Sequence, residues 1–210
     1  KRQNAGSAGY ICAKFDEMPA LFIVKDTPYT IAQIIRALED KELKVQLDNQ
    51  QAKKIKANRN YLEQKMSQKD AVFYGINTGF GSLCNIKIST DELSTLQFNL
   101  VRSHACGTGA LVDHSLCKLI FLLKIVNLSK AYSGVRKELI DHMILLFNKG
   151  LVPVIYEQGS LGASGDLAPL AHLSLMLIGE GKCYYNGRMQ DTAKVFKTLQ
   201  LQPTTLASKE

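Results

Sequence analysis

Residues 159–170 read GSLGASGDLAPL, and this stretch decides how the whole chain is interpreted. Glycine recurs at every third position and encloses the small triad Ala163-Ser164-Gly165. Because glycine adopts backbone angles closed to other residues, the triad can fold tightly on itself. If the Gly165 amide nitrogen attacks the Ala163 carbonyl carbon and water leaves, an imidazolone ring forms. Loss of the Ser164 hydroxyl as a further water then leaves an exocyclic methylidene, an electrophile that no ordinary side chain offers. For the triad alone, a glycine-rich helix cap is the alternative.

The residues after the triad predict a helix start. Asp166 and Pro169 are typical of a first helical turn, and residues 167–178 continue as an apolar run. The amino-terminal end of such a helix carries a partial positive charge, which would stabilise negative charge developing on the ring. A serine-hydrolase elbow is excluded because Asp166 stands where its last glycine belongs, and a P-loop is excluded because no Gly-Lys-Ser/Thr follows.

A second glycine-rich stretch, YGINTGFGS, spans residues 74–82. Its glycines argue against a helix or a central strand and predict a tight loop with Tyr74 at its start. By composition alone, Tyr74 would be a packed loop residue. A tyrosine whose hydroxyl is made more acidic by its surroundings can instead act as a general base.

A third stretch, QFNLVRSHACGTG, spans residues 97–109 and contains His104. A single histidine near a helix end is more often structural than functional. However, Gly107 and Gly109 predict that the helix ends just beyond His104, which places this residue at the end of the helix rather than within it. A ring-binding role for His104 favours a polar ring, imidazole or phenol, because an unpartnered buried imidazole costs roughly 1 to 3 kcal/mol.

These three stretches resemble, in the same order, the signature segments of the aromatic amino acid ammonia-lyase and aminomutase family, and the likeness extends over about residues 21–210. The resemblance implies a 4-methylidene-imidazol-5-one cofactor formed from Ala163-Ser164-Gly165, with neither a metal nor a nucleotide. It also implies a cytoplasmic homotetramer that acts on a small amino acid. One departure is Tyr156, which stands where relatives usually have a second proline that would stiffen the approach to the triad.

Residue roles follow from the same resemblance. It implies that Tyr74 removes the β-proton of the substrate and that His104 faces the substrate ring. Asn77 is expected to support the Tyr74 loop, and Asp166 to position the cofactor loop or assist its cyclisation. The implied reaction is elimination of ammonia from L-histidine to give trans-urocanate. Tyrosine or phenylalanine lyases and 2,3-aminomutases of the same family remain alternatives, as does a non-catalytic assembly module that kept the fold.

Family members are considerably longer than this chain. The resemblance therefore predicts that residues 1–210 form an amino-terminal part that precedes the central helical bundle and is inactive alone. An asparagine that holds the cofactor, a carboxylate-binding arginine, a second catalytic tyrosine and a glutamate are expected downstream.

Composition predicts one domain, mainly α-helical with a few short strands, over residues 20–210, and a flexible end over residues 1–19. The 46% of hydrophobic residues suffice for a sizeable core, and no apolar run reaches membrane-spanning length. The five cysteines are scattered without a C-x-x-C pair, which indicates free thiols rather than disulfides or a zinc site.

The net charge of +7 raises nucleic-acid binding as an alternative. Its densest cluster, residues 53–59, reads KKIKANR and lies in a predicted helix that lacks an aromatic platform. We therefore interpret the cluster as a solvated helix face and expect no nucleic-acid partner. Binding to nucleic acid would weaken steeply with rising salt.

Local signals place the other elements. Thr30 and Gln33 have capping-box spacing at a helix start, as do Ser89 and Glu92 before the helix that leads to His104. Asn186-Gly187 predicts a hairpin. The remaining expectations are strands at 21–24 and 43–45, and helices at 48–66, 113–132, 135–149 and 192–199.

Overall fold

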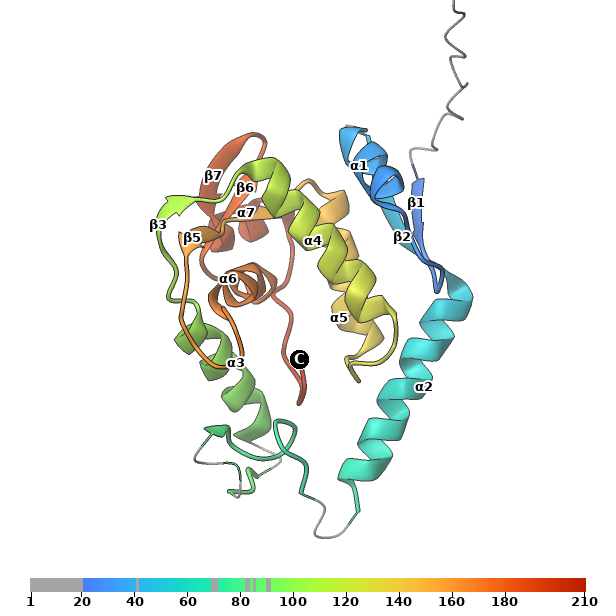
Figure 1. The fold of residues 1–210 in the computed structure, drawn as a ribbon, viewed down its shortest axis with the longest axis vertical. Coiled ribbons are helices and arrows are strands. Elements are labelled where there is room, and N and C mark those ends of the chain that lie inside the picture. Colours follow the sequence, from blue (N-terminus) through green and yellow to red (C-terminus); the bar gives the residue numbers. More distant parts are fainter. Residues whose placement is uncertain (1–20, 41, 69–71, 82–83, 85, 90–91) are drawn as a thin grey trace, which may run out of the picture.

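The computed structural model describes residues 21–40, 42–68, 72–81, 84, 86–89 and 92–210 (Figure 1). The expected flexible end at residues 1–19 lies outside the described residues. The described part is mainly helical with short strands, as the sequence predicts. Its elements are β1 (Leu21–Val24), α1 (Ile31–Glu39), β2 (Lys44–Leu47), α2 (Asn49–Met66), α3 (Leu93–His104), β3 (Thr108–Leu111), α4 (His114–Ser129), α5 (Lys137–Asn148), β4 (Val152–Pro153), β5 (Tyr156–Gln158), α6 (Ala168–Leu177), β6 (Lys182–Tyr185), β7 (Arg188–Asp191) and α7 (Thr192–Leu199).

The first described unit is β1–α1–β2, in which the two strands pair in parallel and α1 crosses between them. The capping box at the start of α1 is confirmed. The Gln33 main-chain N–H donates to Thr30 Oγ1 at 3.2 Å, and the Thr30 N–H donates to Gln33 Oε1 at 2.8 Å. Strand β2 leads directly into α2, whose N-cap is Asp48.

The main core lies between α4, α5 and α6. Phe121, Leu146 and Met176, one from each helix, are completely buried. Around it, β4, β6 and β7 form an antiparallel sheet, and the predicted hairpin at Asn186-Gly187 joins β6 to β7. In Figure 1, α6 lies between α3 and the α4–α5 pair; it packs against α3, and its buried side chains share one core cluster with those of α4 and α5.

The structure corrects one expected helix cap and adds one pair of strands that the sequence analysis missed. The helix that leads to His104 begins at Leu93, and its N-cap Glu92 makes no side-chain cap bond. Ser89 Oγ donates to Glu92 Oε2 at 2.7 Å, so this pair closes a turn before the helix rather than capping it. The β3–β5 pair was not predicted, because its strands are short and separated by two helices.

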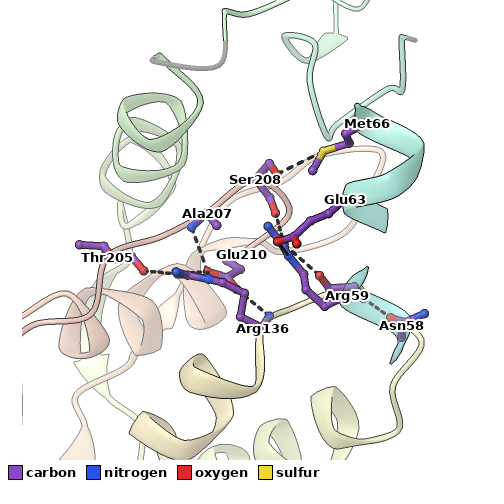
Figure 2. A network of polar contacts seen from close by, with 10 residues as sticks. Asn58, Arg59, Glu63, Met66, Arg136, Thr205, Ala207, Ser208 and Glu210 are labelled. Atoms are coloured by element: carbon purple, nitrogen blue, oxygen red, sulfur yellow. Dashed lines mark hydrogen bonds and ion pairs between the residues drawn. The ribbon is translucent and has the colours of Figure 1, made fainter. Parts of the chain in front are cut away.

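The basic cluster at 53–59 is only partly the solvated face that the sequence predicts. Arg59 is 7% exposed. Its Nη1 donates to the carbonyls of Gly134 and Ser208 at 3.1 and 3.0 Å, and its Nε donates to Glu63 at 2.7 Å (Figure 2). A buried guanidinium needs such partners, and they fasten residues 205–210 to α2.

The carboxylate of Glu210 is the other centre of this network. Its side chain is fully buried and pairs with Arg136 at the start of α5. The main-chain N–H of Arg136 donates to Glu210 Oε1 at 2.7 Å, and that of Ala207 donates to Oε2 at 2.9 Å (Figure 2). Glu210 therefore supplies an anion at a helix amino terminus where the N-cap residue provides no side-chain cap.

Replacing Glu210 with alanine should strongly destabilise the protein, because it leaves the largely buried Arg136 guanidinium without its anion. We expect the free energy of unfolding of the complete gene product to fall by about 2 to 3 kcal/mol in urea titrations. The matched control is Lys194→Ala, which removes a pair to Asp191 from a side chain that is 80% exposed. That change should cost less than about 1 kcal/mol. Equal losses in the two variants would contradict the assignment.

His142 on α5 should make stability depend on pH. Its Nε2 is buried without a partner among the described residues, and burial lowers the pKa of His142 from its ordinary value of 6.5. The folded state therefore disfavours the proton relative to the unfolded state. The resulting contribution to stability is present above pH 6.5 and is lost as the pH falls through that value towards the lower folded pKa.

The test compares urea unfolding at about pH 7.5 and about pH 5.5 for the natural protein and for His142→Phe, which keeps an aromatic ring beside Phe196. The natural protein should lose more unfolding free energy over this interval than the variant. The same loss in both proteins would show that His142 makes no contribution.

Candidate active site

A cavity of about 640 Å³ brings together three of the predicted site residues, Tyr74, His104 and Ser164. They come from three separate segments, the loop after α2, the end of α3 and the loop before α6. Apolar side chains of α4, α5 and α6 form much of the remaining lining. A cavity of this size is typical of small-molecule sites, and the convergence of a phenol, an imidazole and a small hydroxyl side chain gives it functional groups.

The Ala163-Ser164-Gly165 triad lies in a tight turn. The Gly165 main-chain N–H donates to the Gly162 carbonyl at 3.1 Å, and Gly165 has a φ of +88°, which favours glycine. The turn is exposed and carries no bulky side chain, so its backbone is free to approach itself closely. These features fit a segment that must cyclise between residues 163 and 165.

Asp166 fixes both ends of this turn. Its Oδ1 accepts from the main-chain N–H of Ser160 at 2.8 Å, from the Ser160 hydroxyl at 3.2 Å and from the N–H of Ala168 at 3.0 Å. The Ser160 N–H contributes most to holding the pKa of the Asp166 carboxyl below its ordinary value. Gly159 must lack a side chain, since an added Cβ would lie 1.8 Å from Asp166 Oδ2.

The Tyr74 loop is held by buried polar groups. Asn77 is 5% exposed, and its Oδ1 accepts from the Phe73 main-chain N–H at 2.7 Å. Residues 77–79 pair with 86–88 through main-chain hydrogen bonds that include Ile88 to Asn77. Tyr74 itself is 63% exposed and packs edge-on against Phe80. The Tyr74 hydroxyl accepts from the Gly81 main-chain N–H at 3.5 Å, and the Tyr74 side chain lines the cavity.

His104 is the last residue of α3, and its tautomer follows from its contacts. Nδ1 lies 2.8 Å from the Leu100 carbonyl, which only accepts hydrogen bonds, so Nδ1 carries the hydrogen. In the neutral imidazole, Nε2 is then an acceptor. A neutral His104 thus suits a ligand ring that offers an N–H or O–H donor.

Lys124 on α4 is one of the polar cavity residues that the sequence analysis missed. Burial lowers the pKa of Lys124. The available signal was a lysine that interrupts an otherwise apolar helix, but the pattern could not tell which side of the helix faces a cavity. Glu210 also lines the cavity beside Lys209, and its burial depends on Arg136 far away in the sequence.

The described residues offer neither a cluster of metal ligands nor a membrane-spanning helix. They contain no group of three or more His, Cys, Asp or Glu side chains placed to hold a metal. No helix in the described ranges has the length and apolarity needed to cross a membrane. Cys84, Cys106, Cys117 and Cys183 are free thiols, and Cys12 lies outside the described residues.

Comparison with known proteins extends these observations. Residues 29–210 match the family model described as aromatic amino acid lyase. The chain is 49% identical over 176 residues to the histidine ammonia-lyase of Legionella pneumophila strain Paris. The aligned residues cover 84% of this chain and 35% of the relative. The chain therefore spans about a third of that relative's length.

Two solved structures have the same fold over 90% of this chain. The phenylalanine aminomutase of Pantoea agglomerans gives a TM-score of 0.83 at 30% identity, with 36% of its chain covered. The histidine ammonia-lyase of Trypanosoma cruzi gives a TM-score of 0.80 at 31% identity, also with 36% of its chain covered.

The packing of Asp166 against Gly159 predicts different effects for two glycines of the same loop. Gly159→Ala should displace the Asp166 carboxylate and release the Ser160 N–H, so that the Ser160 amide exchanges roughly tenfold faster with deuterated water. Gly162→Ala is the matched control, because the nearest atom to its added Cβ is 3.7 Å away. Unchanged exchange in Gly159→Ala, or the same acceleration in both variants, would contradict the described turn.

Proposed function

Because this chain belongs to the aromatic amino acid lyase family, we propose that the complete gene product eliminates ammonia from L-histidine and releases trans-urocanate. One observation carries the proposal: Tyr74, His104 and Ser164 line a single cavity. The chain spans 35% of its Legionella relative, so the proposal concerns the complete gene product, and residues 1–210 alone are expected to be inactive.

The cofactor of the proposed reaction is 4-methylidene-imidazol-5-one formed from Ala163-Ser164-Gly165. The residues present fit this group, because the turn is tight, free of bulky side chains and fixed at both ends by Asp166. The group supplies an electrophile that takes up the substrate amine and makes it a better leaving group. No metal or nucleotide enters the proposal.

The other residues act on the substrate or hold the machinery. Tyr74 takes the β-proton, and its exposed side chain, which lines the cavity from a loop held by Asn77, suits that role. Asn77 keeps the loop in place. His104 orients the ring, since its Nε2 can accept the N–H of an imidazole. Helix α6 begins three residues after the triad, and the Asp166 carboxylate holds its first N–H, from Ala168, in place.

Tyrosine is a second candidate substrate, because the acceptor at His104 would also bind a phenol O–H. The structural likeness does not separate lyase from aminomutase chemistry, since the Pantoea aminomutase and the Trypanosoma lyase resemble this chain about equally. The histidine ammonia-lyase identity of 49% to the Legionella relative favours histidine. We further propose a cytoplasmic homotetramer, as the family resemblance implies.

The deciding experiment combines mass spectrometry with product analysis on the complete gene product. The peptide containing residues 163–165 should be lighter than its sequence by two water molecules, and histidine should yield ammonia and urocanate faster than tyrosine or phenylalanine yields any product. Ser164→Ala should abolish the second water loss and lower activity by at least about a thousandfold. Ser67→Ala, whose hydroxyl binds the Gln64 carbonyl on α2, is the control and should stay active.

The outcomes separate the alternatives. A modified protein that prefers tyrosine or forms a β-amino acid would transfer the assignment to another member of the family. An unmodified triad in the complete gene product, without ammonia release, would favour the non-catalytic assembly module.

A further inference from the structure

His172 on α6 plays no part in the chemistry proposed above, yet it links the segment that follows His104 to the helix that follows the triad. Its Nε2 accepts the main-chain N–H of Gly107 at 2.9 Å. Gly107 follows His104 by three residues, and His172 belongs to the helix that begins just after the triad. We infer that His172 is a positioning residue that fixes ring-binding His104 relative to Ser164 by holding the main chain at Gly107. The inference rests on the proposed function.

The hydrogen bond defines the state of the His172 ring. A backbone N–H only donates, so Nε2 must present its lone pair and the neutral ring carries its hydrogen on Nδ1. Partial burial lowers the pKa of His172, which favours this neutral form. The side chain is therefore an acceptor matched to the one backbone donor that faces it.

The ring occupies a closely fitted position. A Cβ added at Gly107 would lie 2.9 Å from His172 Nε2 and 3.2 Å from the Tyr156 Cβ. The His172 ring also packs against the Tyr156 ring, with the two ring centroids 5.0 Å apart. Because Gly107 has no side chain, the His172 ring can approach its main chain closely, and the Tyr156 ring packs against the His172 ring in this position.

The hydrogen bond between Gly107 and His172 also closes a circuit of main chain that includes the triad. Immediately after Gly107, β3 pairs with β5 through Thr108 and Gln158, and β5 leads into the triad loop and then α6. The bond from Gly107 to His172 returns from α6 to the start of that circuit. The triad is thus a segment of this closed circuit, and His104 lies three residues outside it, before Gly107. Loss of the bond would let the α3 end move relative to the triad.

A second link joins the same two regions and provides a control. Arg102 on α3 pairs with Glu180, which follows α6, through nitrogens and oxygens 2.5 to 3.2 Å apart. Both side chains are partly exposed, at 52% and 38%, and exposed ion pairs contribute little. Arg102→Met therefore removes an α3–α6 link without touching the main chain at Gly107.

The test measures kcat and KM for histidine in the complete gene product carrying His172→Leu, His172→Gln or Arg102→Met. His172→Leu leaves the Gly107 N–H unpaired and should lower kcat/KM roughly tenfold. His172→Gln places an amide oxygen near the former Nε2 position and should restore most of the activity. Arg102→Met should stay within about twofold of the natural protein. Mass spectrometry of residues 163–165 should show the same loss of two water molecules in every variant.

A double-mutant cycle with His104→Ala distinguishes positioning from general stability. If His172 acts through His104, His172→Leu should lower kcat/KM much less in the His104→Ala background than alone. Equal effects in both backgrounds, or natural activity in His172→Leu, would overturn the inference. If His172→Leu does not fold, Gly107→Ala tests the same contact from the other side and should give the same non-additive loss.

Failure of the proposed function has a different signature. In that case the natural protein itself releases no ammonia from histidine, and the inference falls with the function on which it rests. An active natural protein with additive His172 and His104 effects would refute the positioning role alone.

Discussion

The arrangement of the candidate site depends on one carboxylate oxygen, Oδ1 of Asp166. It accepts hydrogen bonds from Ser160 on one side of the triad and from Ala168 at the start of α6 on the other. A flexible chain of small residues would otherwise lose its geometry to conformational entropy. Two of the spaced glycines have separate purposes. Gly159 leaves room for the Asp166 carboxylate, and Gly165 adopts the left-handed backbone conformation within the turn. The turn geometry that the proposed cyclisation of the triad requires therefore comes from packing around Asp166 and not from flexibility.

The cavity is positioned by elements that are themselves strongly held. Helix α6 packs between α3 and the α4–α5 pair, and its buried residues extend the main core. Residues 205–210 also border the cavity, and Arg59 and Glu210 tie this segment to α2 and α5. Both charges are buried, so each must keep its partners, and this requirement restricts where the segment beside the cavity can lie. The polar network thus specifies where residues 205–210 lie, while the apolar core provides most of the favourable free energy of burial.

Sequence reasoning succeeded where the signal lies within a few residues. The Thr30 capping box and the Asn186-Gly187 hairpin form as predicted, because each depends on neighbouring backbone groups alone. It failed where a residue's role is set by distant partners. Arg59 belongs to a basic cluster by sequence, but the carbonyl of Ser208, 149 positions away, makes it a buried anchor. The three motifs gave the cavity residues through family resemblance, whereas Lys124 and His172 required the packing of α4 and α6.

The departure at Tyr156 shows how a local irregularity can be compensated. A proline there would restrict the backbone before the triad through its fixed φ. Tyr156 instead pairs with Leu111 across β3–β5 and packs its ring against His172. The first contact orders the main chain by pairing β5 with β3, and the second packs that strand against α6. Rigidity before the triad therefore comes from tertiary contacts rather than from a constrained residue. Since those contacts include His172, which also holds Gly107, the main chain before the triad and the segment after His104 depend on the same packing.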